Sequence, residues 1–228
     1  MTAESPVAGR RPETLDRLAA AISAAQRSGQ VLQVAVDGVD GAGKTVFADE
    51  LADLLRQRGA SVLRASVDGF HHPPEVRYRR GRSSPEGFFL DSFDYPALRR
   101  LLLEPLTTRG DRQIVRRIYD VHSEMPVDPV VESAAGVNVL VFDGIFAHRP
   151  ELRDLWDCSA FLQVSFEVSI PRGAGRGYGD PDPAAESNRR YIEGQRLYHR
   201  ACDPHRHATW TVNNNVLDDA HILDRPEP

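Results

Sequence analysis

Short apolar runs alternate along the chain with longer segments in which apolar residues recur at helical spacing. The short runs are typical of buried parallel strands, which we expect at residues 31–37, 61–67, 137–142, 160–166 and 209–212. The helical spacing predicts helices at residues 12–29, 46–58, 96–103, 150–156 and 184–200. Because strands and helices alternate, the pattern predicts an α/β fold with a mostly parallel sheet flanked by helices.

Two stretches break this alternation. Residues 68–95 are rich in Arg, Gly, Pro and aromatic residues, and we expect the adjacent Pro73 and Pro74 to prevent regular structure there. Irregular segments of this length usually serve a function, so we expect an insertion that helps to form a substrate pocket. Residues 112–119 and 127–132 are predicted to pair as a small hairpin beside it.

Length and composition indicate one globular domain. Residues 1–11 are polar, so we expect a disordered tail followed by a single domain over residues 12–228. With 41% hydrophobic residues, a net charge of −5 and two cysteines, the chain gives no reason to expect a nucleic-acid partner or a disulfide framework. No apolar stretch is long enough to span a membrane. We therefore expect a cytoplasmic protein without a membrane partner. The sequence leaves open whether the protein forms a homo-oligomer.

The segment from Gly38 to Thr45 matches the phosphate-binding pattern G-x-x-x-x-G-K-[ST]. Its glycines let backbone N–H groups point at phosphate oxygens, while Lys44 would reach the β- and γ-phosphates and Thr45 would bind Mg²⁺. The segment follows a predicted strand and precedes a predicted helix, which places a helix N-terminus against the phosphates. The sequence thus predicts that ATP and Mg²⁺ bind at Gly38, Asp40, Gly41, Ala42, Gly43, Lys44, Thr45 and Val46.

Two carboxylates follow predicted strands. Asp143 comes directly after the apolar run 137–142, where proteins with this loop place the acidic residue that supports Mg²⁺. Asp68 also lies at the carboxyl end of a predicted strand, the edge at which open α/β sheets bind ligands. A carboxylate there can accept the proton of a substrate hydroxyl that attacks a γ-phosphate.

Five segments in chain order resemble the uridine kinase and phosphoribulokinase branch of P-loop kinases. They are Gly38–Thr45, Asp68-Gly69-Phe70-His71, Phe93-Asp94-Tyr95-Pro96, Tyr119-Asp120-Val121-His122-Ser123 and Phe142-Asp143-Gly144-Ile145. The chain departs from the family pattern at several places: His71 stands where Tyr is usual, and Asp143 stands where Glu is usual. His122 also lies closer to Tyr119 than in typical uridine kinases.

The resemblance implies a role for each matching residue. The implied catalytic residues are Lys44, Asp68 as the base, and Arg172 and Arg176 as lid residues that neutralise the transferring phosphoryl group. The implied acceptor-binding residues are Phe70, His71, Asp94, Tyr119 and His122. Asp94 would bind ribose hydroxyls, and Tyr119 and His122 would line the nucleobase. Thr45 and Asp143 would hold the metal.

Glycines crowd the segment that carries the two implied lid arginines. Gly173, Gly175, Gly177 and Gly179 are enough to prevent a rigid helix, so we expect a mobile lid over residues 172–179. Such a lid would close over phosphates and exclude water.

The resemblance therefore implies an ATP-dependent kinase that phosphorylates a small acceptor, with uridine at its 5′-hydroxyl as the first expectation. Kinases of pantothenate, glycerate or a sugar phosphate share the same scaffold and stay open as alternatives. A P-loop NTPase that hydrolyses nucleotide without an acceptor is a further class. The polar and aromatic insertion favours a kinase, because a kinase must build an acceptor pocket and an NTPase needs only to orient water.

Overall fold

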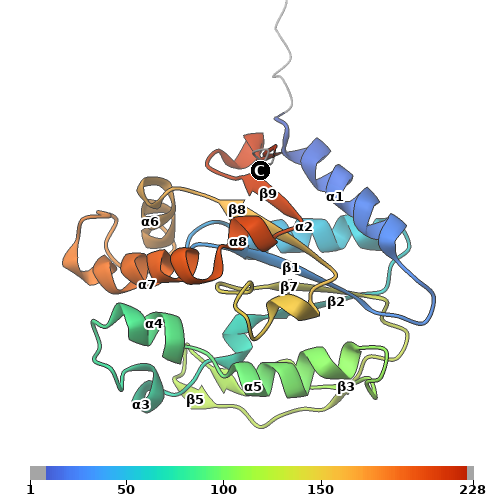
Figure 1. Ribbon diagram of the computed structural model, residues 1–228, viewed down its shortest axis with the longest axis horizontal. Coiled ribbons are helices and arrows are strands. Elements are labelled where there is room, and N and C mark those ends of the chain that lie inside the picture. Colours follow the sequence, from blue (N-terminus) through green and yellow to red (C-terminus); the bar gives the residue numbers. More distant parts are fainter. Residues whose placement is uncertain (1–8, 225–228) are drawn as a thin grey trace, which may run out of the picture.

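A computed structural model of the chain describes residues 9–224 and contains a central six-stranded sheet (Figure 1). The strands run in the order β10-β9-β8-β1-β7-β2, and all pairs are parallel except β9 with β10. Their bounds are β1 (Leu32–Gly38), β2 (Val62–Ser66), β7 (Val139–Asp143), β8 (Cys158–Gln163), β9 (Trp210–Asn213) and β10 (His221–Ile222). The expected α/β fold with a mostly parallel sheet is confirmed.

Helices cover both faces of this sheet, as Figure 1 shows in the view along its edge. Alternate residues of β7 explain why: Val139 and Val141 pack into one buried cluster, and Leu140 and Phe142 pack into the other. The first cluster lies under α1 (Arg11–Ala25) and α2 (Lys44–Gln57). The second includes residues of α4 (Pro85–Asp91), α5 (Tyr95–Leu98) and α7 (Glu186–Cys202).

The predicted elements agree with the structure best in the sheet and least in the connections. The strand expected at 160–166 ends at Gln163, because Phe166 already begins α6 (Phe166–Ala174). The helix expected at 150–156 is reduced to the 3₁₀ turn η4 (Arg153–Leu155), and β10 was not predicted. Helix α8 (Pro204–His207), which follows α7, and the turn η5 (Leu217–Asp219) are short.

The insertion after β2 is more regular than its prolines suggested. It contains the 3₁₀ turn η1 (Val67–Phe70) and the short helix α3 (Pro74–Arg77) before α4. Pro74 stands at the first position of α3, where the missing N–H of proline costs no hydrogen bond. The expectation that the prolines exclude regular structure was therefore wrong, because they start a helix instead of interrupting one.

The predicted hairpin is present as two small antiparallel pairs. β3 (Gln113–Ile114) pairs with β6 (Glu132–Ser133), and β4 (Tyr119–Asp120) pairs with β5 (Met125–Pro126). Between the insertion and β3, α5 continues into the π-helical turn η2 (Arg99–Leu103) and the 3₁₀ turn η3 (Glu104–Leu106). In Figure 1 this group lies below the central sheet, on the side of α3, α4 and α5.

The two ends of the described chain lie close together. Arg10 donates to Asp219 at 2.6 Å, and Arg11 already belongs to α1. Residues 1–8 of the predicted tail lie outside the described residues. Within residues 9–224, none of the helices combines the length and the apolar character that crossing a bilayer requires.

Candidate active site

The P-loop forms one wall of a cavity of about 760 Å³ at the carboxyl ends of β1 and β7. Gly41 and Gly43 adopt positive φ angles of 73° and 88°, which side chains other than glycine rarely adopt. A Cβ atom on Gly41 would also lie 2.0 Å from the Ser169 carbonyl of α6. Gly43 precedes Lys44, the first residue of α2, so the N-terminus of that helix faces the cavity.

Of the predicted nucleotide-binding residues, five line the cavity: Asp40, Gly41, Gly43, Lys44 and Thr45. Gly38, Ala42 and Val46 are not among its lining residues. Ala42 is fully buried beneath the loop, where the Asn214 side chain donates to its carbonyl at 2.7 Å. Lys44 Nζ donates to the Val39 carbonyl at 2.9 Å, so the ammonium group is folded back over the loop.

Thr45 and Asp143, the two residues expected to hold the metal, meet at the cavity. Thr45 Oγ1 donates to Asp143 Oδ2 at 2.8 Å, and both residues line the cavity. Hydroxyl and carboxylate oxygens are donors that Mg²⁺ prefers. Within residues 9–224 there is no group of three or more His, Cys, Asp or Glu that could cage a metal. The donor set therefore fits an Mg²⁺ ion that shares its remaining ligands with phosphates and water.

Asp68 lies across the cavity from the P-loop. It belongs to η1, whose first turn is fixed by a hydrogen bond from the Asp68 N–H to Ser66 Oγ at 3.3 Å. Burial raises the pKa of Asp40 and the negative charge of Asp68 raises it further, while the Lys44 ammonium opposes both. Asp40, Lys44 and Asp68 are thus close enough to interact through their charges.

Aromatic and basic side chains line the end of the cavity farther from the P-loop. His71 packs on Phe93 with a ring separation of 4.4 Å, and burial lowers the pKa of His71. Tyr119 is buried, and its hydroxyl donates to Glu124 at 3.2 Å. Arg77 is also buried, pairs with Glu124 and lies 6.0 Å from the centre of the Tyr119 ring.

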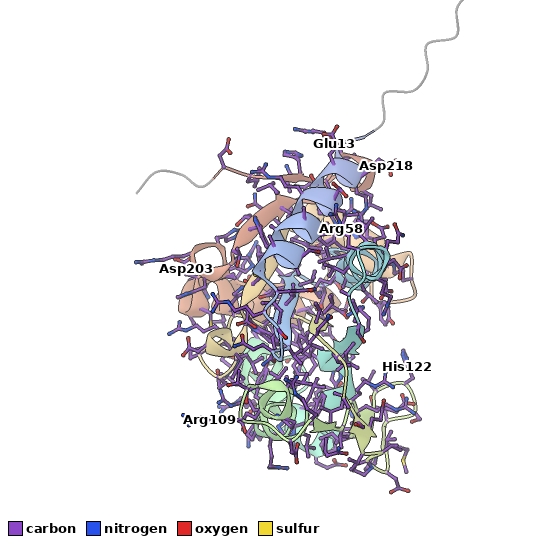
Figure 2. The ribbon with its side chains drawn as sticks, turned by 90° about the vertical axis from the view of Figure 1, so that its right-hand side faces the viewer. Glu13, Arg58, Arg109, His122, Asp203 and Asp218 are labelled. Carbon is purple, nitrogen blue, oxygen red and sulfur yellow. The ribbon has the colours of Figure 1, made fainter. Side chains whose placement is uncertain are left out.

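The structure brings some of the predicted acceptor and lid residues to this cavity and leaves others out. His71, Tyr119, His122 and Arg176 line it. His122 is exposed, and Figure 2 shows it at the outer margin of the molecule. Phe70, Asp94 and Arg172 are not among the lining residues.

Each of the three residues left out has another partner in the fold. Phe70 is fully buried in the core. The Asp94 carboxylate accepts from the Ala97 N–H at 2.9 Å and so caps α5. Arg172 lies in the last turn of α6 and donates to the Asn214 carbonyl at 2.9 Å. The implied lid pair is therefore divided, with Arg176 at the cavity and Arg172 tied to the segment after β9.

Helix α7 contributes site residues that the sequence did not single out. Gln195 is 1% exposed, and its side-chain oxygen accepts from the Asp40 N–H of the P-loop at 2.7 Å. Arg190 is buried and donates to the carbonyl oxygens of Arg77 and Arg82 in the insertion. The sequence pattern shows only a polar helix, because the partners that bury these side chains come from distant segments.

A buried polar network lies beneath the P-loop and was also missed. The Asp37 carboxylate accepts from the Gly38 N–H at 2.7 Å, from His148 Nδ1 at 2.7 Å and from the Tyr198 hydroxyl. Burial alone would raise the pKa of Asp37. The hydrogen bond and charge of His148, together with the hydrogen bonds from Tyr198 and Gly38, hold that pKa below its usual value. One carboxylate therefore joins the P-loop, the segment after β7 and α7.

Comparison with known proteins adds to this geometry. A model of the phosphoribulokinase/uridine kinase family matches residues 33–177, which include the P-loop, Asp68 and Asp143. The chain belongs to this family. Family membership agrees with the resemblance of its five segments.

The individual relatives that resemble this chain are distant. Thymidylate kinases of Xanthomonas campestris are 32% identical over 133 residues, and the match spans 55% of this chain and little more than half, 56%, of theirs. A uridine kinase of Ureaplasma urealyticum is 24% identical over 155 residues, which cover 68% of this chain and 72% of that one. The solved structure of a possible uridine kinase from Bacillus stearothermophilus has the same fold, with a TM-score of 0.71, 20% identity and coverage of 88% and 97%.

Proposed function

We propose that this kinase transfers the γ-phosphoryl group of ATP to the 5′-hydroxyl of a ribonucleoside, with uridine as the first candidate. One observation carries the proposal: Asp68, Lys44, Thr45 and Asp143 line a single cavity whose other end carries aromatic side chains. A nucleotide on the P-loop and a planar acceptor on that aromatic end would bring a γ-phosphate and a hydroxyl together near Asp68.

Asp68 is the group that would accept the proton of the attacking hydroxyl, since it is the carboxylate that faces the P-loop from the insertion. Lys44 and Arg176 would neutralise charge on the transferring phosphoryl oxygens. Bound Mg²⁺ supplies further charge neutralisation at the phosphates. The glycine segment that carries Arg176 would limit access of water and so favour transfer over hydrolysis.

The acceptor-binding end supports a planar ligand. His71, Phe93 and Tyr119 line this end, so a nucleobase bound there would contact aromatic rings. The Tyr119 hydroxyl and Glu124 already share a hydrogen bond, so the polar groups beside these rings are fixed in place before a ligand arrives. The similarity to uridine kinases is consistent with this acceptor class.

A second acceptor class is favoured by Arg77. Its Nε atom is buried without a hydrogen-bond partner among residues 9–224, and Arg77 lines the cavity. An unpaired guanidinium donor suits a carboxylate or phosphate oxygen, so an anionic acceptor such as glycerate, pantothenate or a sugar phosphate is the competing proposal.

The test is a panel of acceptors in which ADP formation is measured above the hydrolysis background with Mg²⁺ and ATP present. Uridine, cytidine and deoxyuridine are compared with glycerate, pantothenate and sugar phosphates. Stimulation by a nucleoside supports the first proposal, and stimulation only by anionic acceptors replaces it with the second. If ADP forms at the same rate without any acceptor, the protein acts as a P-loop NTPase and both proposals are wrong.

A further inference from the structure

Both oxygens of the Asp143 carboxylate already accept a hydrogen bond from the protein. Thr45 Oγ1 donates to Oδ2 at 2.8 Å, and Arg64 Nη2 donates to Oδ1 at 2.8 Å. The Asp143 side chain is 4% exposed and that of Arg64 is 18% exposed, so little water screens their charges. The carboxylate that is expected to hold the metal is therefore in direct contact with a permanent positive charge, the Arg64 guanidinium.

Four acceptors hold the Arg64 guanidinium in one orientation. Besides Asp143, it donates to the Val141 carbonyl of β7 at 2.6 Å, to Asp49 of α2 at 2.9 Å and to the Ala65 carbonyl at 3.3 Å. A planar guanidinium can serve several acceptors in fixed directions, which a lysine ammonium on a flexible stem does less well. Arg64 is not among the residues that line the cavity, so it contacts Asp143 away from the cavity surface.

We propose that Arg64 is a positioning residue that compensates the charge of Asp143 before Mg²⁺ binds and thereby weakens the affinity of the site for the free ion. A buried carboxylate without a counter-charge would attract any divalent cation strongly. Because Arg64 neutralises Asp143, a free Mg²⁺ ion gains less from entering the site than it would otherwise. A nucleotide-bound Mg²⁺ brings phosphate oxygens that the P-loop and Lys44 bind in addition, so the site favours the metal as its nucleotide complex.

This inference rests on the P-loop and on the fit of Mg²⁺ to Thr45 and Asp143, and it does not depend on the acceptor. The direct measurement is calorimetric titration of the full chain with Mg²⁺ alone, with no nucleotide or acceptor present. A failure of the acceptor panel therefore leaves the result of this titration unaffected. Thermal unfolding with and without Mg²⁺ gives a second readout of the same binding.

Arg64→Met removes the charge and keeps an unbranched side chain. We expect this variant to bind free Mg²⁺ about tenfold more tightly than wild type, which is a modest fraction of what a unit charge contributes at contact distance. Arg64→Lys keeps the charge and serves as the matched control, with an affinity close to that of wild type. Asp49→Asn is a second control, because it breaks the other ion pair of Arg64 and leaves Arg64 on Asp143.

The double variant Arg64→Met, Asp143→Asn should lose the gain in affinity, which would locate the gained ion at Asp143. The inference is overturned if Arg64→Met binds free Mg²⁺ no more tightly than wild type, or if Arg64→Lys gains as much as Arg64→Met. If circular dichroism shows that Arg64→Met does not fold, Arg64→Gln replaces it, because glutamine is polar and carries no charge.

Discussion

Lys44 is the only lysine among the 28 lysine and arginine residues of the sequence. Apart from histidines, every other basic side chain that lines the cavity is an arginine. A lysine ammonium is a compact point charge with three donors, whereas a guanidinium is planar and needs more room. Lys44 folds back over a loop that is closely packed, since the Ser169 carbonyl of α6 would clash with any Cβ on Gly41. This crowding favours the compact ammonium group of lysine over the larger guanidinium of arginine.

We expect Lys44→Ala to lose phosphoryl transfer by at least about 10²-fold, because the transferring oxygens lose a preorganised donor. Lys44→Arg should not restore activity, since the larger group does not fit the folded-back position. Steady-state ADP formation measures both variants, and circular dichroism checks that they fold. Arg56→Ala on the exposed side of α2 is the matched control and should retain activity. Near-normal turnover in folded Lys44→Ala would contradict the P-loop assignment.

Asp68 and Asp143 lie at different places around the same cavity. Replacing each carboxylate by the corresponding amide should therefore impair the reaction in a different way. Asp68→Asn is expected to lower kcat about 10²–10⁴-fold with little change in ATP binding, because it removes a base and not a phosphate ligand. Asp143→Asn should instead raise the Mg²⁺ concentration needed for half-maximal rate. Rates over a range of Mg²⁺ and a nucleotide-binding titration separate the two. Equal losses of ATP binding in both variants would rule out the separate roles.

At the scale of elements, the glycine pattern predicts a single lid over residues 172–179, but the structure divides this segment into two parts. Residues up to Ala174 belong to α6, and Arg172 is anchored to the Asn214 carbonyl. Burial lowers the pKa of Arg172, and the positive charges of Arg176 and Arg11 lower it further. Beyond α6, Gly177 and Gly179 adopt positive φ angles of 90° and 73°. We therefore expect residues 175–179 to be the part that closes over a nucleotide.

Amide hydrogen exchange with and without an ATP analogue and Mg²⁺ tests this division. We expect protection to rise across residues 175–179, which carry Arg176, and to stay nearly constant across the anchored part of α6. The buried strand β7 provides the internal control, because its amides should be protected in both states. Unchanged exchange at residues 175–179 would show that this segment is not a lid.

Helix α7 joins the two sides of the site. A Cβ atom on Gly194 would lie 2.8 Å from a Phe88 ring carbon, so this glycine allows α7 to approach α4 closely. The neighbouring Gln195 reaches the P-loop, and Arg190 reaches the insertion. A change in the packing of this one helix would therefore affect both the P-loop and the insertion.

At the scale of the whole molecule, stability depends on carboxylates that the fold keeps ionised. Asp91 is buried, and burial alone would raise its pKa, but Arg79 and Arg80 hold it below the usual value. Its folded pKa is thus lower than its unfolded pKa. The stability from this group is present above the unfolded pKa of about 3.9 and is lost as pH falls through the folded pKa.

We therefore expect Asp91→Asn to be less stable than wild type at pH 7, with a difference that shrinks as pH falls below about 4. Thermal unfolding, followed by circular dichroism at pH 7 and at a pH below about 4, measures this difference in stability. Asp154→Asn, whose carboxylate is 86% exposed, is the control and should change the unfolding temperature little at either pH. A difference between Asp91→Asn and wild type that does not depend on pH would mean that Asp91 acts through packing alone.

The sequence by itself determined those features that depend on neighbours along the chain. The P-loop is one continuous segment, so its pattern predicts the loop, the preceding strand and the following helix together. Asp68 and Asp143 could be predicted to share one edge of the sheet because each directly follows a strand-like segment of the sequence, and the carboxyl ends of parallel strands lie at the same edge. The apolar runs predicted the sheet because burial on both faces requires them.

The tertiary structure decided the features in which a side chain finds its partner on a distant segment. Asp94 and Arg172 fit the family pattern by position, but their partners at the helix cap and after β9 keep them out of the lining of the cavity. Asp37 and Gln195 carry no motif, and only folding places them under and beside the P-loop. Arg64 looks like an ordinary polar residue in a short strand, and its contact with Asp143 exists because β2 and β7 pair in register. Local spacing predicts backbone elements, whereas the partners of buried polar groups depend on how those elements pack.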